Sequence, residues 1–109
     1  MSLSEADIAF AKELFSALPN LTTRKMFGGL GIYSDGDIFA LMMSDSRLML
    51  KATGGPFAEK LADVGAEKWT YTRKDGNPSS MPYWTLPEAA LDDPELATAL
   101  ANEALAALR

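Results

Sequence analysis

The chain has 109 residues, of which 48% are apolar, and this size and composition are typical of a single packed domain. It contains no histidine and no cysteine, which excludes disulfides, thiolate metal sites and Ser-His-Asp or Cys-His catalysis. The net charge is −5: residues 1–23 and 86–109 together carry −6, and residues 24–85 carry +1. We therefore predict one non-enzymatic domain over residues 1–109, with no catalytic residue, metal or cofactor.

The first predicted element is an amphipathic helix. Ser4 is a suitable N-cap, and Asp7 stands three residues later, as in a capping box. Apolar residues then recur at helical spacing until Pro19, which is predicted to end the helix. No apolar run is long enough to cross a membrane, and the N-terminal segment lacks the basic start of a signal peptide. We expect a cytoplasmic protein without membrane association.

Three strands are predicted next, at about 24–33, 37–43 and 47–52. The segments 34–37 and 44–46 between them are short and rich in Ser, Asp and Gly, which is typical of turns that join antiparallel neighbours. The run at 37–43 is apolar on both faces, and this pattern predicts a central strand covered by helices on at least one side.

The first predicted strand contains Gly28, Gly29 and Gly31. A Gly-rich stretch is also typical of phosphate-binding loops, but such loops need a helix directly after the glycines. Here the order is strand, turn, strand. We therefore interpret the three glycines as structural, at points where a strand bends, bulges or passes close to another backbone.

The second half of the sequence predicts a short helix at about 54–65 and strands at 68–72 and 80–85. Pro82 has no amide proton, so the last strand is predicted to be an edge strand or to begin late. Asp93 is a suitable cap for a final helix. The predicted fold is a two-layer α+β domain of order α-β-β-β-α-β-β-α. Its five-stranded, mostly antiparallel sheet carries the first and last helices on one face.

Tyr83 and Trp84 are the aromatic pair that most suggests a binding surface, because Tyr and Trp are common at interface hot spots. Strand alternation places them on opposite faces, so one is predicted to be core and the other partly exposed. The alternative is a purely structural role under the last helix. The candidate partner surface consists of Tyr83, Trp84, Pro82 and Tyr33.

Basic residues in the sheet segments form a second candidate surface, which would suit nucleic acid if they shared one face. The alternative is a solvated face balanced by nearby carboxylates, and the net negative charge favours it. Direct nucleic-acid binding is therefore predicted not to be tight. The candidate basic residues are Arg24, Lys25, Arg47, Lys51, Arg73 and Lys74.

Two segments carry a family resemblance: RKMFGGLGIYSDGDIFAL at 24–41 and MPYWTLPEAALDDPEL at 81–96. Together they resemble the N-terminal domain of the TfoX (Sxy) family, bacterial regulators of natural competence, from Thr23 to the last helix. The resemblance implies an α+β fold and action as a transcription co-activator with the cyclic-AMP receptor protein. Full-length members carry a second, C-terminal domain, whereas this chain ends at Arg109, so we expect a stand-alone relative.

Three classes of function follow from the sequence. The first is a regulatory protein-interaction domain that binds a protein partner or a second copy of itself, and we favour it. The second is a direct DNA- or RNA-binding protein, which the acidity disfavours. The third is a small ligand-binding domain or enzyme, and the absence of histidine and cysteine disfavours an enzyme.

Overall fold

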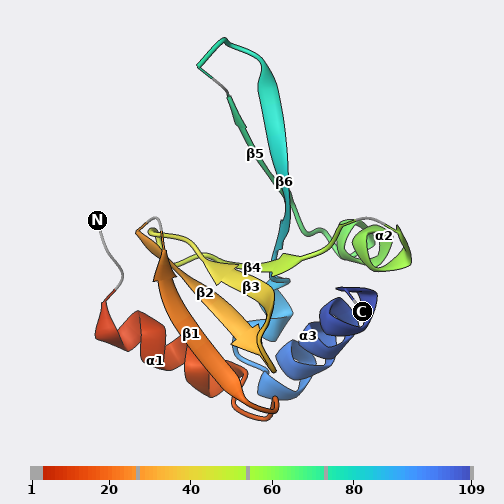
Figure 1. The fold of residues 1–109 in the computed structure, drawn as a ribbon. Helices are drawn as coiled ribbons and strands as arrows, with labels where there is room; N and C mark the ends of the chain where they lie inside the picture. Colours follow the sequence, from red (N-terminus) through yellow and green to blue (C-terminus); the bar gives the residue numbers. More distant parts are fainter. Residues whose placement is uncertain (1–3, 27, 54, 73, 109) are drawn as a thin grey trace.

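The structure is a computed structural model that describes residues 4–26, 28–53, 55–72 and 74–108 (Figure 1). Within these residues the chain forms three α-helices, one short 3-10 helix and six strands, in the order α1-β1-β2-β3-β4-α2-β5-β6-η1-α3. The predicted α+β class and antiparallel sheet are confirmed. The sheet has one strand more than predicted.

The additional strand arises because the predicted strand at 24–33 is in fact a hairpin. It consists of β1 (Leu21–Met26) and β2 (Gly29–Ser34), and Met26 pairs with Gly29 across the turn. Gly28 lies in this turn with a φ of 78°, a left-handed conformation that glycine adopts without strain. The apolar run is therefore split by a chain reversal that its hydrophobic pattern does not reveal.

The remaining strands are β3 (Asp37–Met42), β4 (Leu48–Lys51), β5 (Lys68–Thr72) and β6 (Pro78–Thr85). The sheet order is β1-β2-β3-β4-β6-β5, and every neighbouring pair is antiparallel. The prediction that the last strand is an edge strand or begins late is wrong, because β6 lies between β4 and β5 and begins at Pro78, before the predicted start. The edges of the described sheet are β1 and β5.

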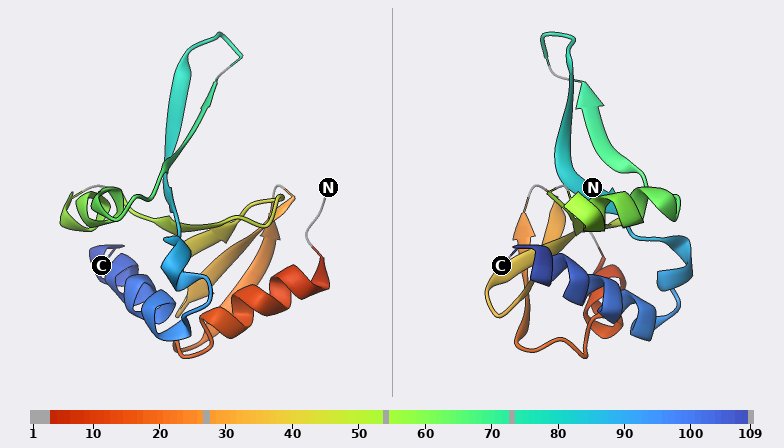
Figure 2. Two further views of the ribbon diagram at one scale, coloured as in Figure 1. Left: turned by 180° about the vertical axis from the view of Figure 1, so that it is seen from behind. Right: turned by 90° about the vertical axis from the view of Figure 1, so that its right-hand side faces the viewer.

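The helices α1 (Glu5–Leu14) and α3 (Pro94–Leu108) lie on the same face of the sheet, as predicted (Figures 1 and 2). The short α2 (Gly55–Asp63) links β4 to β5, and η1 (Glu88–Ala90) precedes α3. The face of the sheet away from α1 and α3 is called the open face below.

Both long helices begin with the caps that the sequence predicts. The Ser4 hydroxyl accepts a hydrogen bond from the Asp7 amide at 3.1 Å, and the Asp7 carboxylate accepts one from the Ser4 amide at 3.2 Å. The Asp93 carboxylate accepts one from the Leu96 amide at 3.2 Å. However, α1 ends at Leu14, well before Pro19, and tight backbone turns fill the interval.

The core fills the space between α1, α3 and the sheet. Phe15, directly after α1, meets Phe39 of β3 edge to face, with ring centroids 5.2 Å apart and an interplanar angle of 85°. Ser34 is fully buried, and its hydroxyl donates to the Pro19 carbonyl at 2.7 Å. The Lys60 ammonium donates to the Glu103 carboxylate at 2.8 Å, which joins α2 to α3.

Candidate functional site

Strands β5 and β6 form a two-stranded arm that stands away from the body on its open-face side (Figures 1 and 2). We call residues 68–82 the arm. β6 pairs with β4 only at Tyr83–Thr85, and beyond that range its strand partner is β5 alone. Within the described sheet, the outer edge of β5 pairs with no other strand. The arm is therefore held to the body only at its base.

A bulge marks the base of the arm and explains how β6 accommodates its proline. Lys68 pairs with Trp84, but Thr70 pairs with Ser80, so Trp69 stands opposite three residues of β6. Pro82 is one of those three, and β4 pairing starts only at the residue after it. The Pro82 carbonyl accepts a hydrogen bond from the Ala52 amide at 2.9 Å, so its missing amide proton faces the point just past the end of β4, where proline is tolerated inside a sheet.

Tyr83 and Trp84 lie on opposite faces of the sheet, as strand alternation predicts. Trp84 pairs with Leu50 and packs, half-buried, against the helix-side core. Tyr83 is only 6% exposed, although it faces away from α1 and α3. The open-face aromatic is thus the more buried of the two, because the arm rises beside it and turns that part of the open face into a corner.

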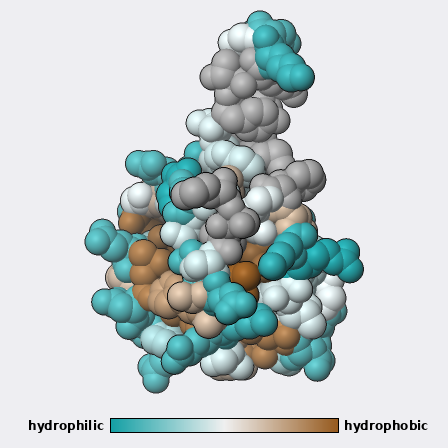
Figure 3. All heavy atoms as spheres, turned by 90° about the vertical axis from the view of Figure 1, so that its left-hand side faces the viewer, coloured by the Kyte–Doolittle hydropathy of each residue, from teal (hydrophilic) through white to brown (hydrophobic). Residues whose placement is uncertain are grey.

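This corner contains a pocket of about 390 Å³. Met26, Gly29, Leu41 and Met43 line it from the sheet, and Trp69 and Tyr83 from the arm and its base. We call it the corner pocket. Figure 3 shows hydrophobic surface on the body below the arm, with hydrophilic residues at the arm tip and around the margin. The lining of the corner pocket is mostly apolar.

The phenol of Tyr83 provides a test of the corner in solution. Burial raises the pKa of Tyr83 above its ordinary value of 10.0, and the Tyr33 phenol raises it further. A raised folded pKa adds stability that is complete below the unfolded pKa and is lost as the pH rises through the folded pKa. We therefore expect the parent to lose stability relative to Tyr83→Phe as the pH rises from the ordinary value of 10.0 through the raised folded pKa, as measured by urea unfolding. Parallel loss in the two proteins would mean that the phenol ionises as freely as in the unfolded chain.

A sequence model described as the TfoX N-terminal domain matches residues 13–108, which is nearly the whole chain. The chain belongs to this family. No curated protein matches the chain. At family level, membership supports a domain of regulatory type, in agreement with the resemblance seen in the two sequence segments.

In this TfoX N-terminal domain the three predicted structural glycines occupy three different environments. Gly28 forms the β1–β2 turn. A Cβ atom on Gly29 would overlap the backbone carbonyl oxygen of Met42, so this glycine allows two backbones to approach closely. A Cβ on Gly31 would lie 2.7 Å from the Met26 methyl carbon and 3.0 Å from the Tyr33 ring. The absence of a Cβ atom at Gly31 thus leaves space for side chains of the open face to approach one another.

The candidate partner residues are only partly brought together. Tyr33 and Tyr83 share the open face, whereas Trp84 lies on the other face and Pro82 in the bulge. The corner pocket adds Trp69, Leu41 and the methionines, which the sequence did not single out as a site. The alternation of Trp69 with polar residues along β5 was a sequence signal that could have placed its side chain on one face of the sheet. No sequence signal indicated the angle between the arm and the sheet.

The candidate basic residues that the structure describes do not form one patch on this domain. Arg24 and Lys51 lie on the open face, whereas Lys25 faces α1. The Arg47 guanidinium is paired with Asp45 at 2.9 Å. Lys74 is exposed at the arm tip, and Arg73 lies outside the described residues. This scatter gives little support to phosphate-backbone binding, which depends on clustered cations.

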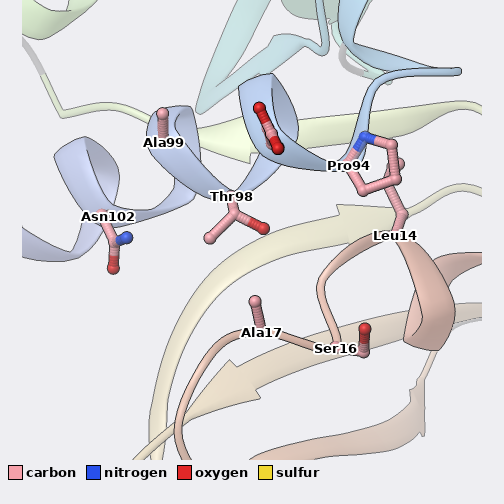
Figure 4. Close-up of a pocket in the computed structure, with 8 residues that line it drawn as sticks. Leu14, Ser16, Ala17, Pro94, Thr98, Ala99 and Asn102 are labelled. Atoms are coloured by element: carbon pink, nitrogen blue, oxygen red, sulfur yellow. The ribbon is translucent and has the colours of Figure 1, made fainter.

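A second hollow of about 370 Å³ lies between the end of α1 and α3 (Figure 4). Ala17 and Ser16 form one side, and Thr98 and Asn102 of α3 the other. Apart from the carboxylate of Glu95, the side chains that line this hollow are small or neutral. Within the described part of the chain, no group of three acidic, His or Cys residues is placed to hold a metal, and no helix is long and apolar enough to span a membrane.

Proposed function

We propose that this protein is a non-enzymatic regulatory domain that acts by binding a protein partner through its β5–β6 arm. The observation that carries the proposal is the arm itself, which leaves the body as a two-stranded ribbon whose outer edge pairs with no other strand of the described sheet. The absence of histidine and cysteine supports a role in binding rather than catalysis.

A two-stranded ribbon has no third strand to support it. An isolated two-stranded hairpin is marginally stable in water, and an open edge presents unpaired amide and carbonyl groups. A partner that adds a strand along β5 would extend the described sheet by one strand. The edge segment Lys68–Thr72 contains no proline, so a continuous ladder is available there. Pro82 belongs to β6, which lies between β4 and β5, so it does not block the outer edge of β5.

The partner is proposed from the family resemblance. TfoX-like domains are implied to act with the cyclic-AMP receptor protein in the bacterial cytoplasm, in control of competence genes. The cyclic-AMP receptor protein is therefore the first partner to test, and a second copy of the chain is the next. Direct nucleic-acid binding is the weaker candidate because the described basic side chains are dispersed and the chain is acidic.

The test is a trimmed variant in which residues 71–79 are replaced by Asn-Gly. Thr70 and Ser80 face each other across the ladder, so a two-residue turn can join them. We expect binding to immobilised cyclic-AMP receptor protein to fall at least about tenfold, with a nearly unchanged melting temperature, because the core lies elsewhere. Phe10→Ser, an exposed change on α1, is the matched control.

Parent-like binding by the trimmed variant would contradict the role of the arm. If the parent shows no complex, the proposed partner is wrong, and sedimentation of parent and trimmed protein then tests the homodimer. A parent that is monomeric at all concentrations and binds no receptor protein would refute both forms of the proposal.

A further inference from the structure

We propose that the corner pocket binds an uncharged, planar aromatic molecule about the size of two fused rings. This inference goes beyond the proposed function and does not depend on it, since it concerns the foot of the arm and not its free edge. It assigns a small-molecule site to a chain for which a protein partner was the favoured expectation.

The lining selects against a charged ligand. None of the described residues that line the corner pocket carries a charge. Their polar side-chain groups are neutral: the hydroxyl of Ser44, the phenol of Tyr83 and the indole N–H of Trp69. Moving a charge from water into such surroundings without a counterion is costly. A ligand with one neutral polar group, such as a hydroxyl or a carbonyl, matches the Ser44 hydroxyl and the Tyr83 phenol.

The walls favour an aromatic ligand over an aliphatic one. Trp69 and Tyr83 line the arm side of the pocket, and aromatic rings prefer offset-stacked or edge-to-face contact with one another. Met26 and Met43 line the sheet side, and thioether sulfur makes favourable contacts with ring edges and adapts its shape. Both walls therefore gain more from a flat ring system than from a flexible chain.

The size of the pocket sets the size of the ligand. An apolar cavity of about 150 Å³ holds a single benzene ring. The corner pocket has about 390 Å³, which is enough for two fused rings with a polar substituent. Met26, Leu41, Met43 and Trp69 are each half-buried and so reach solvent, whereas Tyr83 is buried at the base. A ligand can thus enter without unfolding of the domain.

The experiment uses the two tryptophans as reporters. The chain contains only Trp69 and Trp84, which lie on opposite faces of the sheet, and Trp→Phe variants assign their indole N–H signals in an NMR spectrum. The probe is 2-naphthol, which is neutral near physiological pH. Its charged counterpart, 2-naphthalenesulfonate, is titrated in parallel. We expect 2-naphthol to shift the Trp69 signal to saturation with one molecule per chain, and the Trp84 signal to stay in place.

Two comparisons sharpen the test. The sulfonate should bind at least about tenfold more weakly than 2-naphthol. Leu41→Asp, which adds a carboxylate to the sheet wall, should weaken 2-naphthol binding about tenfold, whereas Phe10→Asp on α1 should not. Shifts that do not saturate, equal shifts of both indole signals, or equal affinity for the sulfonate would each overturn the inference. If Leu41→Asp fails to fold, the two probes on the parent chain decide the matter alone. The trimmed-arm result bears only on the proposed partner, so the two failures are distinguishable.

Discussion

Phe39→Ala is expected to lower the free energy of unfolding by about 3–5 kcal/mol, the usual cost of removing a buried phenylalanine ring. Phe39 is 0% exposed and meets Phe15 edge to face, so truncation removes a large contact area and leaves a cavity. Urea unfolding of the parent and the variant measures the difference. Val64→Ala, at a side chain that is 56% exposed, should change stability by no more than about 0.5 kcal/mol.

The pairing of the two rings can be separated from simple burial by a double-mutant cycle. Phe15→Ala and the double variant complete the cycle, and the coupling should be about 0.5–1.5 kcal/mol. A loss below about 1 kcal/mol for Phe39→Ala would mean that the sheet and α1 are not packed as described.

Gly29→Ala is the second large effect, expected to cost about 1–3 kcal/mol. The added methyl group would overlap the Met42 carbonyl oxygen, and that backbone is fixed by the pairing of β2 with β3. Gly31→Ala is the matched comparison, because its nearest neighbour is the mobile end of the Met26 side chain. We expect Gly31→Ala to cost less than Gly29→Ala in thermal or urea unfolding. The reverse order would show that the close approach at Gly29 relaxes easily.

The parts of the fold that depend on local pattern were predictable. The caps at Ser4 and Asp93 follow from side chains that satisfy helix-end amides, and the alternation of Tyr83 and Trp84 follows from strand geometry. These features require only neighbours within a few residues. The predicted family is likewise confirmed by the match over residues 13–108. It was predictable because two separated sequence segments carry the resemblance.

The parts that depend on distant pairing were not predictable. The apolar run around Gly28 is compatible with one strand and with a hairpin. The left-handed φ of Gly28 at the turn distinguishes the hairpin from a single strand. The position of β6 between β4 and β5 depends on its pairing with β4, from which α2 and β5 separate it in sequence. The hydrophobic pattern does not encode this pairing. For the same reason the sequence did not single out Met26 and Met43, although the arm makes them part of a pocket lining.

The sheet order also bears on how the chain folds. The four strands from β1 to β4 pair with their neighbours in sequence, so each step closes only a short loop. Joining β6 to β4 instead closes a loop that contains α2 and β5, and long-loop closure slows folding. We therefore expect the β1–β4 meander to form first and the β4–β6 seam to be the late, rate-limiting event.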